Sequence, residues 1–400
     1  MMSVYFILAL TALAVGAILL RHRGRNQSSN GRLSGSTGPD VSNPASSAGQ
    51  TKCPYTRFLR MLGLKRGNTS KTVSVKKVLD SPLDAGDKAV EPILADLQAN
   101  ILTGHGRDFA RMLFVRIDAA RVNEAKSWVS EFAKQHVTSA LRQKHQRFMF
   151  REAGLDGGRI CHVAIAAAGY RKLGYAETAL PQGSDPFARR SSTGYRNVFA
   201  DGAKKRQPNL LDADVAHWDA GYRQDIDLMV LVADDHSDAL TAFVETLAAE
   251  IAHFGSIDAI ESGQTVHRTF QLKDGEHELG VEHFGFVDGR SQPLLLKNEV
   301  EAEANVGSNV WDAAAPAKLV LVPDALSSSP NSYGSFLVFR KLEQNVRGFR
   351  RAMKSLGDSL GVPADLAGAM AVGRFEDGTP ISNSGKSGVG PVNDFDFASD

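Results

Sequence analysis

Strand-like and helix-like patterns of apolar residues alternate along the chain from Glu91 onward. An apolar run at residues 111–117 is typical of a buried strand, and apolar residues then recur at helical spacing over residues 122–132. A second apolar run at residues 161–168 ends before Gly169. These patterns predict a strand, a helix and a further strand in succession.

A second pass of the same kind begins at residue 226. Residues 226–233 form another apolar run, and residues 240–251 repeat apolar side chains at positions i, i+3, i+4, i+7 and i+11. A late strand is predicted at 334–342, followed by a helix with apolar positions between 346 and 356. Two such passes predict an α+β fold of two similar halves, each an antiparallel sheet with helices on one face.

The N-terminal segment has a different pattern. Residues 1–20 carry no charged side chain, and the 17-residue run from Val4 to Leu20 is almost entirely apolar. Such a run suits a short transmembrane anchor. The alternative is a cleaved signal peptide, but the basic residues follow the run, beginning at Arg21, and do not precede it. Because positive charges flank its C-terminal end, we expect a single-pass anchor with the rest of the protein on the cytoplasmic side.

Residues 21–90 are expected to be a basic flexible linker between the anchor and a body at 91–400. Of the 28 residues from Gly24 to Thr51, 21 are Gly, Ser, Thr, Asn, Gln or Pro, which leaves too few apolar groups to form a core. Residues 55–66 then interleave apolar and basic side chains. This pattern fits either a short helix on an anionic membrane or a solvated linker.

The charges divide the chain into two opposed parts. The 400 residues hold 46 Lys and Arg against 45 Asp and Glu, a net charge of +1. Residues 1–79 contain 12 bases and one acid, so the remainder is strongly acidic. An acidic body argues against nucleic-acid binding. The two cysteines, Cys53 and Cys161, are too few for a disulfide framework or a zinc site.

Candidate chemistry is concentrated at residues 282–293, Glu-His-Phe-Gly-Phe-Val-Asp-Gly-Arg-Ser-Gln-Pro. Gly285 and Gly289 allow tight bends and the close approach of a flat ligand, and Phe284 and Phe286 could wall in Asp288. A carboxylate in apolar surroundings has a raised proton affinity and can shuttle protons. Taken alone, an Asp-Gly pair is more often an ordinary turn.

The segment from Gly285 to Gly289, with Ser291 and Pro293, resembles the Gly-x-x-Asp-Gly signature of the dye-decolourising peroxidases. Five further segments are similar to that family in the same order along the chain. They are residues 96–104, 166–174, 334–344, 371–380 and 393–397. The resemblance covers about residues 91–400 and implies a haem b protein built from two ferredoxin-like halves.

The resemblance also implies roles for individual residues. Asp288 would take a proton from hydrogen peroxide and return it to the departing oxygen, and an organic donor such as a phenol or dye would be oxidised. Arg340 would approach a haem propionate, although a salt bridge at the end of a strand is the simpler interpretation. Four residues after the aspartate would line the haem, namely Gly289, Arg290, Ser291 and Gln292.

One family feature has no counterpart in this sequence. Family members bind the haem iron through a histidine in an Ala-His-Ile-Arg type of sequence, which follows an Asn-Asp-Phe segment. The last histidine here is His283, and the 117 residues after it contain none. We therefore assign no metal ligand, expect a C-terminally truncated chain or gene fragment, and expect weak haem retention.

The sequence thus favours a membrane-tethered haem peroxidase of the dye-decolourising type, which could form a homo-oligomer. The alternative is a membrane-attached ferredoxin-like domain without catalysis, acting in binding or assembly. The missing ligand and the basic linker support this alternative. A coding sequence that continues past Asp400 into Ala-His-Ile-Arg would decide for the peroxidase.

Overall fold

The computed structural model of the chain describes residues 3–5, 78–181, 195–289, 292–304, 312–382 and 384–393. The chain divides into two compact units, one formed by Met1–Ile18 with Ser74–Asp400 and the other by Leu19–Val73. The second unit and most of the predicted linker lie outside the described residues. All of the described helices and strands belong to the first unit.

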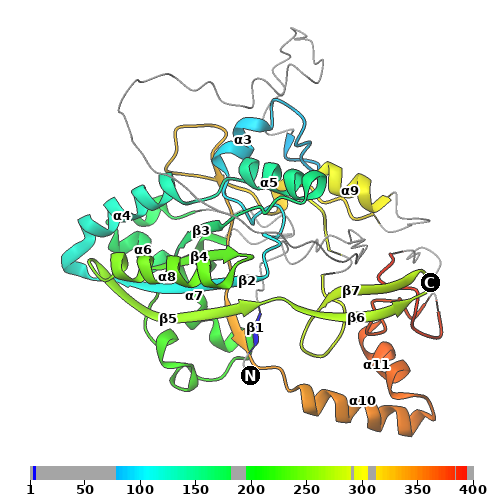
Figure 1. Cartoon of the computed structure of the whole chain (residues 1–400). Coiled ribbons are helices and arrows are strands. Elements are labelled where there is room, and N and C mark those ends of the chain that lie inside the picture. The colour runs from blue at the N-terminus through cyan, green and yellow to red at the C-terminus, as the bar shows by residue number, and fades with distance from the viewer. Residues whose placement is uncertain are drawn as a thin grey trace, which may run out of the picture. The chain divides into compact units, whose positions relative to one another are not determined.

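A four-stranded antiparallel sheet organises the N-terminal half of the body (Figure 1). Its strands are β2 (Phe109–Ile117), β3 (Ile160–Ile165), β4 (Leu228–Asp234) and β5 (Gly255–Gln264), in the order β3-β4-β2-β5. Helix α4 (Val122–Gln135) follows β2, and α8 (Ser237–Ile251) follows β4. This βαββαβ succession with β2 and β4 in the centre is the ferredoxin-like arrangement, which confirms the first predicted half.

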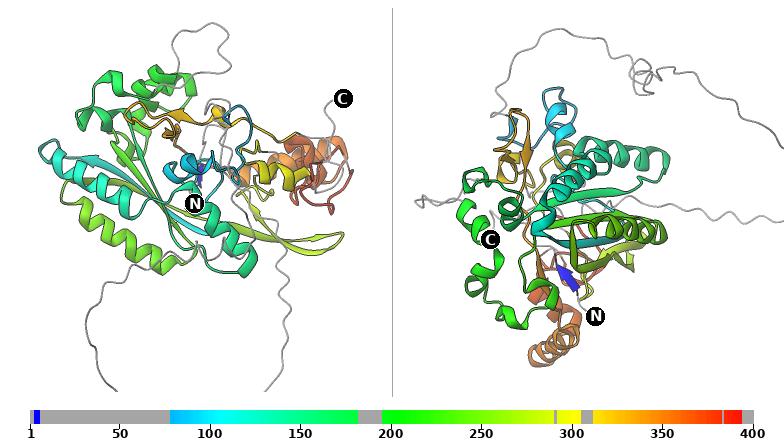
Figure 2. Two further views of the ribbon diagram at one scale, coloured as in Figure 1. Left: turned by 90° about the horizontal axis from the view of Figure 1, so that it is seen from above. Right: turned by 90° about the vertical axis from the view of Figure 1, so that its left-hand side faces the viewer.

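Helices α4 and α8 pack on the same face of this sheet (Figure 2). Ala125 and Phe132 from α4 meet Leu240, Leu247 and other apolar residues of α8 over the strands. The opposite face is also covered, because Phe114 of β2 packs against Tyr222 and Phe339. Burial on both faces explains why β4 is apolar from Leu228 to Ala233 and why every residue of the strand is buried.

Several elements are added to this sheet. Helix α5 (Ala140–Ala153) follows α4. The other added elements are the helices α3 (Glu91–Asp96) and α9 (Lys297–Ala304) and the short 3₁₀ helices η1 (Ala119–Arg121) and η5 (Ala317–Leu319). A long insert joins β3 to β4. It contains α6 (Ala167–Lys172), η2 (Glu177–Ala179), α7 (Tyr195–Leu210), η3 (Val215–His217) and η4 (Ala220–Tyr222), and α7 is interrupted at Gly202.

The second predicted half is not a four-stranded sheet within the described residues. The remaining strands pair in three two-stranded ribbons: β6 (Val266–Leu272) with β7 (Gly275–Val281), β8 (Val322–Pro323) with β9 (Tyr333–Gly334), and β1 (Ser3–Tyr5) with β10 (Arg340–Leu342). Most of the strand predicted at 334–342 has no ladder partner among them. A strand needs a neighbour to satisfy its backbone groups, so the apolar run alone did not determine its pairing.

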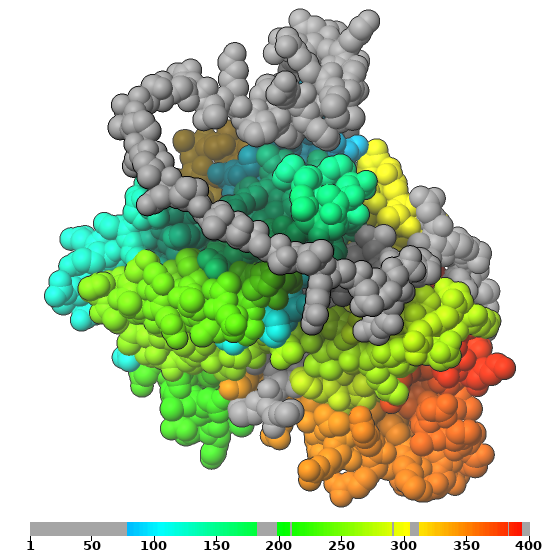
Figure 3. Space-filling model, in the orientation of Figure 1, coloured from blue at the N-terminus to red at the C-terminus, as the bar shows by residue number. Residues whose placement is uncertain are grey.

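Two helices complete the C-terminal region. They are α10 (Val346–Leu360) and α11 (Ala364–Val372), which pack against each other beside the β6–β7 hairpin (Figures 1 and 3). Asn345 caps α10 by accepting a hydrogen bond from the Gly348 amide, and Gly361 ends it in the left-handed conformation.

The predicted anchor at residues 1–20 is described only at Ser3–Tyr5, which form a strand. Its other residues lie outside the described part of the chain. None of the helices in the described ranges combines the length and the apolar character that a membrane crossing requires.

Candidate functional site

The segment that carries Asp288 leaves β7 and folds back against the end of that strand. Val287 forms a bridge with Val281, and the Asp288 amide donates to the Gly280 carbonyl over 3.2 Å. Between them, the Glu282 amide donates to the Phe286 carbonyl over 3.0 Å. Gly285 turns the chain with φ of 102°, a conformation that residues other than glycine rarely adopt.

The carboxylate of Glu282 fills the inside of this turn. It accepts hydrogen bonds from the backbone amides of Phe284 at 2.8 Å and Phe286 at 3.0 Å. The side-chain amide of Gln344 donates to it over 3.0 Å. The turn is therefore closed by side-chain as well as backbone hydrogen bonds.

A loop after α11 supports the same segment from another side. The Val287 amide donates to the Glu376 carbonyl over 2.9 Å, and the Glu376 carboxylate pairs with Arg268 of β6. Phe375 beside it is 1% exposed. This loop belongs to residues 371–380, one of the segments that resembles the family, so the structure joins two of those segments at one place.

Phe284 and Phe286, which the sequence led us to expect around Asp288, have a contact on α10 that the sequence did not predict. Both pack on Phe349 of α10, with ring centroids 4.4 Å apart for Phe284 and 5.9 Å apart for Phe286. Apolar rings lower their free energy by mutual burial, and α10 offers an apolar face to them. These two residues therefore anchor the turn to α10.

Asp288 itself presents its carboxyl at the surface of the turn. The residue is exposed, and its Oδ1 accepts a hydrogen bond from the Gly289 amide at 2.8 Å. Protein packed around the group raises the pKa of the Asp288 carboxyl, and the Gly289 hydrogen bond opposes this increase only in part. Gly289 adopts φ of 76°. An accessible carboxyl with a raised pKa is suited to accepting a proton and giving it back.

Of the other predicted site residues, the structure describes Gly289, Gln292 and Arg340. Gly289 lies next to Asp288, and Gln292 is exposed. Arg290 and Ser291 lie outside the described residues. Arg340 forms an ion pair with Asp212 of the insert and donates to the Leu210 carbonyl over 3.4 Å. Its predicted contact with a haem propionate stays a prediction.

The described residues meet part of what a haem requires. The peroxide-side residue fits, because Asp288 is accessible beside a glycine that permits close approach. His283 is exposed, whereas His105 and His162 are enclosed, which lowers the pKa of each to about 4. We assign no axial iron ligand among these residues.

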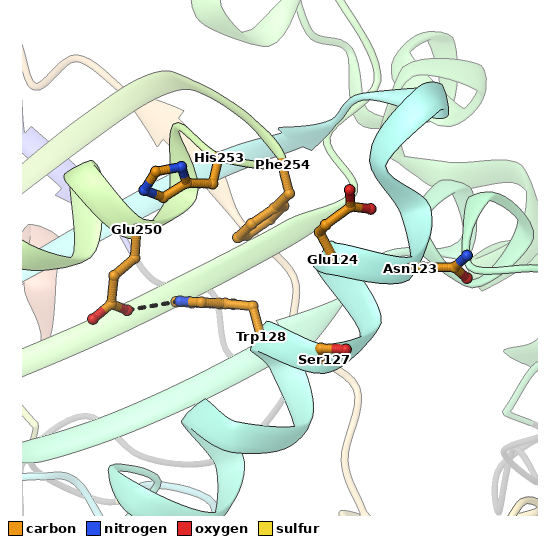
Figure 4. A pocket seen from close by; sticks show the side chains of 7 residues that line it. All are labelled: Asn123, Glu124, Ser127, Trp128, Glu250, His253 and Phe254. Carbon is orange, nitrogen blue, oxygen red and sulfur yellow. Dashed lines mark hydrogen bonds between the residues drawn. The ribbon is translucent and has the colours of Figure 1, made fainter.

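An open pocket of about 550 Å³ lies elsewhere, between the N-terminal part of α4 and the C-terminal end of α8 (Figure 4). The Trp128 indole donates to Glu250 over 2.7 Å, and its ring stacks on Phe132 with centroids 4.9 Å apart. His253 and Phe254 line the opposite side. None of the predicted site residues lines this pocket.

Sequence reasoning did not identify Glu282 or Gln344 as part of the site. Glu282 opens the string that carries Asp288, and Gln344 ends the resembling segment at 334–344. Their spacing of 62 residues gave no reason to pair them, because only the fold brings the end of β7 beside a residue that follows β10.

The comparisons with known proteins agree on one family. The multifunctional dye peroxidase DyP2 of Amycolatopsis sp. is 36% identical over 317 residues, covering 77% of this chain and 62% of that protein. Peroxidase 2 of Mycetinis scorodonius is 26% identical over 307 residues, covering 72% of this chain and 50% of that protein. The chain thus spans about half to two thirds of the length of these curated relatives. No family model matches it.

Solved structures extend this likeness to the fold. The crystal structure of the DyP-type peroxidase AnaPX from Anabaena sp. superposes with a TM-score of 0.72 at 33% identity, covering 82% of this chain and 69% of that one. The structure of DyP2 from Amycolatopsis sp. gives a TM-score of 0.65 at 34% identity, covering 80% of this chain and 66% of that one. With the Gly-x-x-Asp-Gly turn in place on the hairpin, the chain belongs to the dye-decolourising peroxidase family.

Proposed function

We propose that the protein is a haem-dependent peroxidase that uses hydrogen peroxide to oxidise organic donors such as phenols or dyes. The observation that carries this proposal is Asp288, an accessible carboxyl with a raised pKa on a turn that several separate segments hold in place. The relatives bear names of dye peroxidases, which supports the same activity here. The chain spans 62% of the length of DyP2.

Haem, when bound, supplies the redox chemistry of the reaction. Asp288 handles the proton: its carboxylate takes the proton from one peroxide oxygen and delivers it to the other, which leaves as water. One group can perform both transfers, because the carboxyl is exposed on its turn and its raised pKa makes the protonated form easier to reach. Gly289 places no side chain next to this carboxyl.

The roles of individual residues beside Asp288 are proposed from the resemblance of this segment to the family signature. We propose that Gly289 and Gln292, with Arg290 and Ser291, line the haem b face beside Asp288. The engagement of Arg340 by Asp212 supports a structural role for Arg340 more than a propionate contact. Attachment of the protein to the inner face of a membrane is likewise proposed, on the 17-residue apolar run and the basic residues that follow it.

The test is to supply haem to the purified 400-residue chain and to record its Soret band and peroxide-dependent oxidation of a phenol. With haem in excess, the wild type should hold haem weakly, because we assign no axial iron ligand among the described residues, and should show peroxide-dependent oxidation of the phenol. Asp288→Asn should oxidise more slowly at the same haem occupancy. A chain that binds no haem and shows no peroxide-dependent turnover would contradict the proposal. It would revive the non-catalytic binding domain, which the comparisons do not favour.

A further inference from the structure

We propose that Glu282 is a positioning residue that sets where the Asp288 carboxyl lies, and that Gln344 holds Glu282 in its working orientation. The proposal rests on the proposed function only in that it takes Asp288 to be the proton-transferring group. Its structural content concerns residues of this chain alone.

Glu282 satisfies two backbone donors that its own turn would otherwise leave without partners. Its two carboxylate oxygens accept from the Phe284 amide at 2.8 Å and the Phe286 amide at 3.0 Å. Phe286 is 7% exposed, so water cannot readily replace the lost acceptor there. A charged acceptor makes stronger hydrogen bonds than a neutral one, and an unsatisfied buried amide is costly.

The residues that Glu282 holds are only a few positions from Asp288 along the backbone of the turn. Phe286 is two residues before Asp288, and its carbonyl accepts from the Glu282 amide. The two residues that follow are fixed on different partners, Val287 by the Glu376 carbonyl and Asp288 by the Gly280 carbonyl. If the Glu282 carboxylate were lost, the turn could relax at Phe286, and the backbone that carries Asp288 would move with it.

Gln344 ties this carboxylate to a distant part of the chain. Its side-chain nitrogen donates to Oε2 of Glu282 over 3.0 Å, while its side-chain oxygen is buried without a hydrogen-bond partner. The contact with Glu282 is therefore the hydrogen bond that orients the Gln344 side chain. The next residue, Asn345, caps α10, and Phe349 of that helix packs on Phe284. The start of α10 thus holds the turn by a polar contact and an apolar one.

The test uses the full chain without haem, so that its readouts are independent of turnover. Glu282→Gln and Gln344→Leu are compared with wild type, and Glu278→Gln is the matched control, since Glu278 is an exposed carboxylate on β7 of the same hairpin. Hydrogen exchange of the Phe284 and Phe286 amides is measured by NMR, and the Asp288 carboxyl is titrated by carbon-detected NMR, assigned with Asp288→Asn.

In Glu282→Gln, exchange at Phe286 should accelerate by about tenfold or more, the effect of losing one charge-assisted hydrogen bond. The pKa of Asp288 should fall toward its ordinary value, because the protein packed around the carboxyl raises this pKa and a relaxed turn would bring more water to the group. Gln344→Leu should change the exchange rate at Phe286 and the pKa of Asp288 in the same directions, but by less. Glu278→Gln should leave both quantities unchanged. Thermal melting verifies that each variant is folded, and Gln344→Leu decides the matter if Glu282→Gln does not fold.

A folded variant in which Asp288 titrates as in wild type would overturn the proposal, even if amide exchange rises, because Glu282 would then stabilise the turn without positioning the carboxyl. Equal shifts in Glu278→Gln would also overturn it, since they would show a general effect of charge. Whether Asp288 serves the peroxide reaction is decided separately by Asp288→Asn with haem supplied, so the two proposals can fail independently.

Discussion

Lys172 and Asp227 form an ion pair at the end of β2, with Nζ of the lysine 2.7 Å from Oδ2 of the aspartate. Asp227 has no exposed surface, and the same oxygen accepts from the Ile117 amide at 2.7 Å. The other carboxylate oxygen is buried without a hydrogen-bond partner. Lys172, on α6, also donates to the Ile117 carbonyl over 3.1 Å, so the pair fastens the insert to the end of β2.

Replacing Lys172 by methionine should destabilise the protein by about 3 kcal/mol, because it leaves a buried charge uncompensated. Urea denaturation followed by circular dichroism measures the change. Lys354→Met is the matched control, since its pair with Asp358 is exposed on both sides and should cost about 0.5 kcal/mol or less. The double variant Lys172→Met, Asp227→Asn should recover part of the loss, and equal costs for the two lysine variants would contradict this interpretation.

Asp288→Asn should reduce the rate of the peroxide reaction by roughly 10² to 10⁴, the usual contribution of a positioned acid–base group. In the wild type the reaction needs the carboxylate form, and the pKa of Asp288 is raised. The rate should therefore fall with acid at a higher pH than the ordinary aspartate value of about 3.9 predicts. Stopped-flow absorbance of the haem-loaded protein across pH measures both effects. A pH-independent rate in the wild type would contradict the assignment.

The same raised pKa has a consequence for stability. A folded-state pKa above the unfolded value means that the ionised carboxyl disfavours the folded state at neutral pH, and that this penalty disappears as pH falls below the ordinary value. Asp288→Asn should therefore unfold at a higher temperature than wild type at pH 7 and at a similar temperature near pH 3. Differential scanning calorimetry at the two pH values tests this, and a lower melting temperature for the variant at pH 7 would contradict it.

His162 should make the protein sensitive to mild acid. It is 8% exposed, its Nδ1 has no partner, and burial lowers its pKa to about 4. Below pH 6.5 the unfolded chain takes up a proton that the folded chain accepts only near pH 4, so stability should fall by about 3 kcal/mol across that window. His162→Asn should flatten the decline in urea-unfolding free energy between pH 6.5 and 4. An unchanged slope would show that His162 is not its source.

Arg340 and Asp212 provide a test between two roles for the arginine. Both side chains are largely buried, at 20% and 17% exposed. A double-mutant cycle with Arg340→Gln and Asp212→Asn should give a coupling energy of about 1 to 2 kcal/mol that decreases with salt. If Arg340 binds a haem propionate instead, Arg340→Gln should weaken haem binding while Asp212→Asn leaves it unchanged.

The sequence predicted best those strands and helices whose own spacing of apolar residues reveals which face is buried. The runs at 111–117, 161–168 and 226–233 all became strands of the first sheet, and the helical spacing at 122–132 and 240–251 became α4 and α8. Each of these elements buries a face against the others. The spacing of its apolar residues therefore follows from its type of secondary structure and from the face that is buried.

The prediction was weakest where the structure depends on partners distant in sequence. Asp288 was singled out by the resemblance of its segment to the family signature, but the residues that hold its turn, Glu282 and Gln344, follow no local pattern. The packing of Phe284 and Phe286 on Phe349 was not predicted, because the position of α10 could not be derived from the motif. The run at 334–342 indicated a longer strand than the one that forms at Arg340–Leu342.

The strand order of the first sheet also has a consequence for synthesis of the protein. Strand β2 lies between β4 and β5, so it emerges from the ribosome about 110 residues before its first partner. At typical translation rates this interval lasts roughly 5 to 20 s. During it β2, and β3 once it has been made, have uncovered apolar faces and unpaired backbone edges. Nascent chains halted within the insert between β3 and β4 should therefore be the species most prone to aggregate and most in need of a chaperone.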